Sequence, residues 1–188
     1  MTPSLPMIGR WIGGLCGVLA GGAAMAQGAH VPSAHVHGLA TIEVVQQAQS
    51  VSVQLSVPQE ALLGHERIPR TAAEKKAAAE LLARLRSAAP LVQIDASMQC
   101  RPVRREVQAS RLEPAAGSAA TGGQDEHADV DLAIEHQCAG TAALRQLDLG
   151  PLLDAFKGIA RLEARIVTPA GQFKATLKRP ARVLAWGR

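Results

Sequence analysis

Aromatic residues are scarce in this chain, which contains two phenylalanines, two tryptophans and no tyrosine. Its hydrophobic core must therefore be built from leucine, valine, isoleucine and alanine around Phe156, Phe173 and Trp186. The same scarcity argues against a nucleic-acid-binding protein despite the net charge of +4, because such proteins stack bases on aromatic rings and cluster their basic residues. Here the lysines and arginines are dispersed, and we expect no nucleic acid as a partner.

Long hydrophobic runs are missing as well, with one exception near the start. The run from Trp11 to Ala26 is rich in glycine and shorter than the roughly 20 residues that cross a membrane. Arg10 precedes it and Ala24-Met25-Ala26 ends it with a small-x-small sequence, which is typical of a secretory signal peptide. We therefore expect a signal peptide over 1–26, cleaved after Ala26, and a single periplasmic domain over 27–188 without a permanent membrane span. An uncleaved N-terminal anchor is the alternative.

Cysteine is rare too, and its three copies differ in their expected location. Cys16 lies in the signal peptide, which leaves Cys100 and Cys138 in the exported chain. An even number of cysteines in an oxidising compartment predicts one disulfide bond, and two metal-binding thiolates are the rival interpretation. The bond would join strands on either side of 114–126, a stretch rich in glycine, alanine and serine that we expect to be a flexible loop.

The sequence contains only incomplete catalytic motifs. The sequence around His65 begins like a zinc protease helix, but the second histidine that such a helix needs is replaced by Pro69. Ser118 has no nucleophile-elbow sequence around it. Asp125 begins a sequence that resembles a calcium loop, but Val130 occupies the position that requires glycine. We therefore expect that the protein is not an enzyme.

The rest of the chain shows regular hydrophobic patterns. Apolar and polar residues alternate over 39–47 and 50–58, which predicts an antiparallel hairpin. Thr71 and Glu74 have capping-box spacing, which predicts a helix within 71–90, and a second helix is predicted over 150–158. Further strands are expected over 91–95, 99–113, 127–138, 160–169, 172–178 and 181–186. Pro102 marks the strand within 99–113 as an edge strand or an interrupted one. The predicted fold class is α+β, with antiparallel sheets, two main helices packed on them and one disulfide.

Histidines in two short segments indicate metal binding. In an extended segment, residues i and i+2 point to the same side, so His35 and His37 can direct both imidazoles to one ion. His127 and Asp129 repeat this spacing and supply a nitrogen and an oxygen ligand suited to zinc. Two such pairs from neighbouring strands would complete a tetrahedral site. From spacing alone, polar residues at the ends of strands remain an equal alternative for both pairs.

Two other histidines are weaker candidates. His65 and Glu66 form a second candidate metal pair, although a loop histidine beside a glutamate is ordinary. His136 has the opposite strand parity to His127 and lies near Cys138, so we expect it to pack inside rather than to bind metal.

The chain also resembles a known family. The segments that carry the resemblance are the start typical of export, "HVHG" before the first strand, "GHERIPRTAAEKKA" before the helix, "HADVDLAIEHQC" and "VTPAGQFKATL". In this order they are similar to the ZrgA family of periplasmic zinc-binding proteins. The resemblance implies a non-enzymatic protein that binds Zn²⁺ and assists zinc acquisition or buffering beside a zinc ABC transporter, with His35, His37, His127 and Asp129 as ligands. The histidine-rich tract of the family's middle loop is absent here.

Two alternatives remain open from the sequence. One is a disulfide-bonded structural or interaction module of the cell envelope, in which metal binding is incidental. The other is a copper or nickel carrier, because imidazole also accepts those ions.

Overall fold

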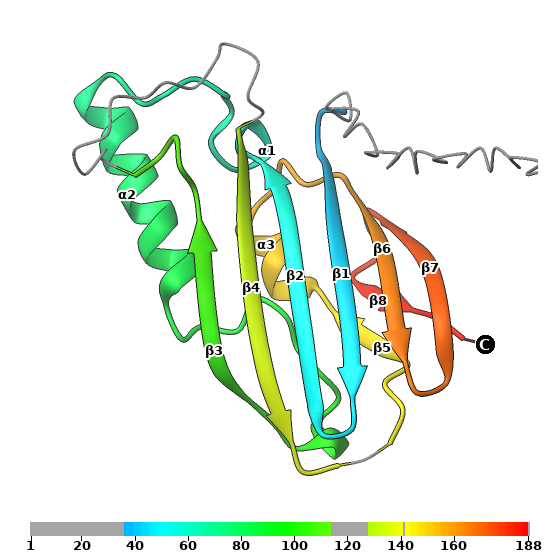
Figure 1. Ribbon diagram of the computed structural model, residues 1–188. Helices are drawn as coiled ribbons and strands as arrows, with labels where there is room; N and C mark the ends of the chain where they lie inside the picture. The colour runs from blue at the N-terminus through cyan, green and yellow to red at the C-terminus, as the bar shows by residue number, and fades with distance from the viewer. Residues whose placement is uncertain (1–35, 114–127, 141, 188) are drawn as a thin grey trace, which may run out of the picture. The chain divides into compact units, whose positions relative to one another are not determined.

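The computed structural model describes residues 36–113, 128–140 and 142–187 of the 188-residue chain. In this part of the chain, six strands form one sheet in the order β3-β4-β2-β1-β6-β7, and β5 pairs with β8 in a second sheet (Figure 1). The strands are β1 Leu39–Gln47, β2 Ser50–Pro58, β3 Cys100–Gln108, β4 Asp129–Cys138, β5 Gln146–Asp148, β6 Arg161–Thr168, β7 Gly171–Lys178 and β8 Val183–Ala185. The helices are α1 Gln59–Leu63, α2 Ala72–Arg86 and α3 Gly150–Ala155, with a 3-10 turn over Ala96–Met98.

Several sequence predictions concern residues outside the described ranges. They are the signal peptide over 1–26 with its cleavage site, the flexible loop over 114–126, and the proposed ligands His35 and His127. These stay predictions. The described residues all belong to one compact unit, 34–188.

The predicted α+β class, with antiparallel sheets and two main helices, is wrong, because the described fold is mostly β. β1 runs parallel to β6 within the large sheet, so this sheet is mixed. The second predicted helix is reduced to the six residues of α3, after which Phe156 leaves the helical conformation. Residues 91–95 form no strand and make only an isolated bridge between Gln93 and Asp148.

These errors have a common physical origin in tertiary structure. The connection between the parallel strands β1 and β6 includes four other strands of the chain, and no local pattern reports such a long crossover. Phe156 turns out of the helix and buries its ring, with 6% exposed. Leu91 and Val92 are apolar because they pack into the core from irregular backbone, which a short apolar run does not distinguish from a strand.

The helix α2 confirms the predicted capping box. The Thr71 hydroxyl accepts a hydrogen bond from the Glu74 backbone N–H at 3.2 Å, and the Glu74 carboxylate accepts one from the Thr71 N–H at 3.1 Å. At the other end, Arg105 of β3 donates to the carbonyl oxygens of Leu85 and Ala89 at 3.1 and 3.3 Å. The helix therefore has a satisfied start, and its last carbonyls are tied to the neighbouring strand.

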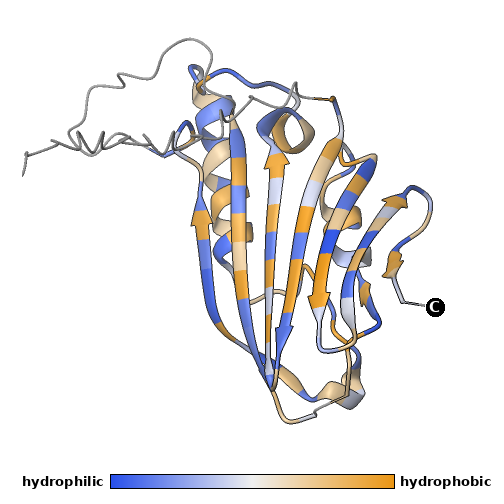
Figure 2. Cartoon of the chain, turned by 45° about the vertical axis from the view of Figure 1, so that its right-hand side comes forward, coloured by the Kyte–Doolittle hydropathy of each residue, from blue (hydrophilic) through white to orange (hydrophobic). Residues whose placement is uncertain are grey.

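The large sheet has one buried face and one open face. Along its central strands, apolar and polar side chains alternate, which Figure 2 shows as alternating orange and blue bands. The helices and the small sheet lie on one side of the large sheet, and its apolar side chains face them (Figure 1). Of the predicted core aromatics, Phe156 and Trp186 are buried and Phe173 is partly buried. The polar face is left uncovered by any described element.

The predicted disulfide is confirmed. Cys100 of β3 and Cys138 of β4 are bonded, and their Cα atoms lie 3.9 Å apart. The predicted edge position of β3 is also confirmed, and a register irregularity falls between Pro102 and Arg104. No residue of β3 is fully buried, so the covalent bond compensates for weak packing of this strand.

Candidate metal site

The two histidine-bearing segments enter the sheet at the same end. Thr41 near the start of β1 pairs with Ser56 of β2, and Ser56 pairs with Asp131 near the start of β4. The starts of β1 and β4 are thus separated only by the end of β2, which places them roughly 10 Å apart at the usual strand spacing. In Figure 1 both strands begin at the top, where α1 also lies. The fold therefore brings together the two parts of the chain that the spacing argument paired.

His37 lies in the turn that leads into β1, and its side chain is 82% exposed. Gly38 gives this turn its shape with a φ of +72°, and a Cβ there would come within 2.9 Å of the Gly158 carbonyl oxygen. The His37 Nδ1 atom lies 3.0 Å from Oε2 of Glu60. When the Nδ1–H group donates a hydrogen bond to this carboxylate, the lone pair of Nε2 is available to a metal ion.

Glu60 is positioned by the residue before it in α1. The Gln59 backbone N–H donates to the Ala128 carbonyl oxygen at 2.7 Å, immediately before β4. Its buried side chain donates to the carbonyl oxygens of His65 and Arg67 at 3.0 and 2.9 Å. These bonds fix α1 between the start of β4 and the loop that follows α1, and they hold the Glu60 carboxylate beside His37.

Asp129 begins β4 opposite Pro58 and is partly buried. It shares strand parity with Asp131 and so lies on the side of the open face. Of the four predicted ligands, the described chain thus includes His37 and Asp129, at the same end of the sheet. Within the described ranges, no group of three or more histidine, cysteine, aspartate or glutamate side chains is close enough together to hold a metal ion. The complete four-ligand set stays a prediction.

The second candidate pair lies after α1. His65 is partly exposed, and its Nδ1 atom lies 3.1 Å from the Arg67 carbonyl oxygen, while Glu66 is exposed. This backbone contact gives the His65 ring a structural role in the loop. The pair of His65 and Glu66 as a second metal site stays a prediction.

His136 packs inside the protein, as its strand parity predicted. Its side chain is buried, and Nδ1 lies 3.3 Å from the Val51 carbonyl oxygen. Burial lowers the pKa of this imidazole, the contact with Val51 opposes the shift, and the charge of Arg105 adds to it. His136 is therefore held neutral in the core, away from the end of the sheet where His37 lies.

The residue that sequence reasoning missed is Glu60. It follows the predicted strand 50–58 by two positions, and the predicted hairpin already places the end of that strand beside the start of the strand at 39. That topological signal could have identified a carboxylate near His37. The short helix that turns Glu60 toward the histidine has no clear sequence pattern, because it is only five residues long.

Together, the fold and this site define a disulfide-bonded β-sheet protein with imidazole and carboxylate groups at one end of its sheet. The model of the ZrgA family of zinc uptake proteins matches residues 34–186, so the chain belongs to that family. This confirms the resemblance drawn from the sequence. The comparison with curated proteins gave no match. None of the helices in the described ranges is long and apolar enough to cross a membrane.

Proposed function

We propose that this chain is a periplasmic, non-enzymatic zinc-binding protein that assists zinc acquisition or buffering for a zinc uptake transporter. Membership of a zinc uptake family supports the role in zinc uptake. The observation that carries the binding proposal is the convergence of the segments of His37 and Asp129 on one end of the sheet. Zinc is the cargo in this proposal, and the protein transfers it without chemical change.

The proposed ligands are His35, His37, His127 and Asp129, with Glu60 in a positioning role. Nitrogen and oxygen ligands of this kind suit a four-coordinate zinc ion. Glu60 orients the imidazole of His37 through the 3.0 Å contact, as carboxylates commonly do for metal-binding histidines. Imidazole binds metal only when neutral, and free imidazole has a pKa of about 6.5, so zinc affinity should decrease below that pH.

Equilibrium dialysis with zinc on the mature chain tests this assignment. The His35→Ala/His37→Ala variant should lose the tight site, and Asp129→Asn should weaken it. Asp131→Asn is the matched control, because it removes a carboxylate two residues further along the same face of β4. Equal zinc retention by wild type and the double histidine variant would show that the site is elsewhere.

The positioning role of Glu60 has its own test. Glu60→Gln should lower zinc affinity about 10- to 100-fold, the usual effect of removing a carboxylate that orients a metal-binding histidine. Glu80→Gln is the control, since the Glu80 side chain is exposed on α2 and pairs with Lys76. Unchanged affinity in Glu60→Gln would mean that the contact with His37 is incidental.

Competition with Cu²⁺ and Ni²⁺ in the same experiment decides whether zinc is the preferred ion.

Export is part of the proposal and can be tested separately. The intact mass of the protein recovered from the periplasm should correspond to residues 27–188. A membrane-bound protein that retains residues 1–26 would favour the uncleaved anchor instead.

A further inference from the structure

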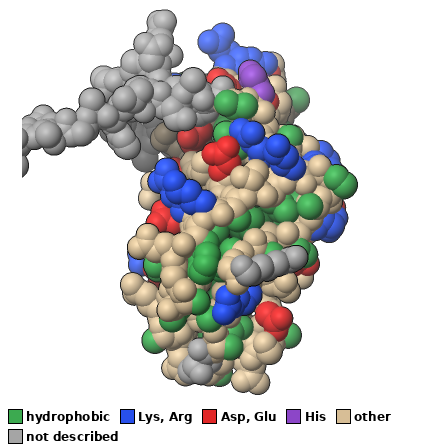
Figure 3. All heavy atoms as spheres, turned by 90° about the vertical axis from the view of Figure 1, so that its right-hand side faces the viewer, with side chains coloured by type: hydrophobic (Ala, Val, Ile, Leu, Met, Phe, Trp, Pro, Cys, Tyr) green, Lys and Arg blue, Asp and Glu red, His purple; other side chains and the backbone are tan. Residues whose placement is uncertain are grey.

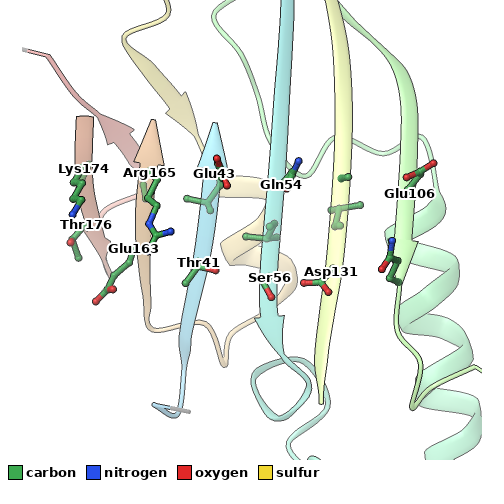
Figure 4. Close-up of a pocket in the computed structure, with 17 residues that line it drawn as sticks. Thr41, Glu43, Gln54, Ser56, Glu106, Asp131, Glu163, Arg165, Lys174 and Thr176 are labelled. Atoms are coloured by element: carbon green, nitrogen blue, oxygen red, sulfur yellow. The ribbon is translucent and has the colours of Figure 1, made fainter. Parts of the chain in front are cut away.

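The open face of the large sheet is a broad polar surface, of which the proposed zinc site uses only the end that carries Asp129. It contains a hollow of about 710 Å³ lined by side chains from all six strands. Figure 4 shows these side chains standing on one side of the sheet, with the helices behind it. Because one face of a sheet is normally covered and the other hydrated, openness alone indicates nothing. The distribution of charge over this face is the informative feature.

Charge on this face is sorted by strand. The half formed by β3 and β4 carries the acidic residues Glu106, Asp129, Asp131 and Glu135. The half formed by β6 and β7 carries the basic residues Arg161, Arg165, Lys174 and Lys178, with Glu163 among them. Figure 4 labels Glu106 and Asp131 at one side of the hollow and Arg165 and Lys174 at the other. Figure 3, which looks onto the β7 side of the molecule, shows lysine and arginine side chains there together with a few acidic ones.

Between the two charged halves, β1 and β2 carry mainly small or uncharged side chains on this face. Thr41 pairs with Ser56, and Val45 pairs with Ser52, while Glu43 opposite Gln54 is the exception. Some charges are paired within the acidic half, since Arg104 contacts Glu106 and lies 3.6 Å from Glu135. Arg101 adds a second positive charge on the same strand, nearer the disulfide. The acidic half nevertheless remains net negative and the basic half net positive.

We propose that this face binds the same face of a second copy of the chain. In a twofold dimer, the direction of the axis decides which half of the second copy each half faces. An axis parallel to the strands places the acidic β3–β4 half over the basic β6–β7 half of the other copy, and does so twice, with Asp131 over Glu163 as the like-charged exception. An axis across the strands would place acid over acid and base over base. Only the first arrangement is electrostatically favourable.

The area of the open face and the irregular β3 edge both agree with a dimer formed through the face. Six strands of about eight residues cover roughly 700 Å² per copy at the usual strand spacing and rise, which is close to the standard size of a specific interface. Pairing of a second chain with the edge strand β3 is disfavoured, because Pro102 has no backbone N–H to donate and the register irregularity follows it. A face with so many charges predicts a salt-sensitive dimer of modest affinity.

Sedimentation equilibrium of the zinc-free mature chain tests the proposal independently of the metal site. We expect a monomer–dimer equilibrium whose dissociation constant rises at least tenfold between low salt and about 0.5 M salt. In the favourable arrangement Glu106 of one copy lies over Lys174 of the other. Glu106→Lys and Lys174→Glu should therefore each weaken the dimer about tenfold or more, and the double exchange Glu106→Lys/Lys174→Glu should restore it.

Lys76→Glu is the matched control, because it reverses an exposed lysine on α2, on the other side of the sheet. It should leave the dimer unchanged. Thermal unfolding of each variant confirms that it is folded. A chain that stays monomeric at low salt, or a dimer that is insensitive to Lys174→Glu, would overturn the proposal. A dimer weakened by both single reversals but not restored by the double exchange would overturn the axis along the strands.

Discussion

The two faces of the large sheet are built from the same strands but serve different purposes. On the buried face Ile42, Val53 and Ile134 are almost wholly covered. On the open face Thr41, Gln54 and Asp131 alternate with them along the same strands. Stability therefore depends on one face, whereas the other is free to carry charge and ligands. This predicts that substitutions separated by a single residue differ sharply in their consequences.

The largest expected effect comes from the buried face. Ile134→Ala should lower the free energy of unfolding by about 2 to 5 kcal/mol, because the Ile134 side chain is only 1% exposed and its truncation leaves a cavity in the core. Gln54→Ala on the open face should change it by less than about 0.5 kcal/mol. Chemical denaturation of the two variants measures the difference. Equal destabilisation would mean that Gln54 is packed within the single folded chain.

The disulfide should have the next largest effect, concentrated in one strand. Cys100→Ala/Cys138→Ala should lower the free energy of unfolding by about 2 to 4 kcal/mol. Because β3 buries no residue fully, its amides should exchange with solvent faster in the variant, while those of β1 should change little. Hydrogen exchange measures both. Uniform acceleration across the sheet would show that the bond stabilises the whole sheet instead.

A smaller effect is expected at the start of α2, which covers the buried face. Thr71→Ala removes the side chain that caps the helix and should lower the free energy of unfolding by about 1 kcal/mol. Thr176→Ala, an exposed threonine on the open face, is the comparison and should have almost no effect. Thermal unfolding distinguishes the two, and equal melting temperatures would contradict the capping role.

The smallest expected effect is a pH dependence that arises from a histidine on the buried face. His136 is buried and its pKa is lowered, so the unfolded chain binds a proton more readily than the folded one. The folded state should therefore lose stability as the pH falls below about 6.5, the value for an unfolded histidine. His136→Leu should flatten this dependence between pH 7 and 5. Identical pH profiles for wild type and His136→Leu would refute it.

Glu74 contributes at lower pH. Its hydrogen bonds, first with Arg67 and then with the Arg70 and Thr71 backbone, lower its pKa to about 2. Because the folded pKa is depressed, the contribution to stability is complete above the ordinary value of 4.5 and is lost as the pH falls toward 2.

Local structure was largely readable from the sequence because its causes are local. The hairpin of β1 and β2 followed from alternation, the start of α2 from the capping box, and the disulfide from a pair of cysteines in a chain expected to be exported. The parallel pairing of β1 with β6 was not predicted, because it joins segments more than a hundred residues apart. The fold class was wrong for that reason and because α3 is shorter than its pattern suggested.

The candidate site shows the same division. His37 and Asp129 were identified by spacing, which is a local property. Glu60 was missed, because its contact with His37 depends on how α1 is fastened to the entry of β4 through Gln59. The charge sorting of the open face was also hidden, since it appears only when the strand order is known.

The most direct test of the zinc site is an NMR titration of the imidazole resonances in the mature chain, which contains all six histidines. On addition of one equivalent of zinc, the signals of His35, His37 and His127 should shift and saturate together. The signal of buried His136 should not move. Saturation at one equivalent that involves His136, or that leaves His37 and His127 unchanged, would contradict a zinc site at this end of the sheet.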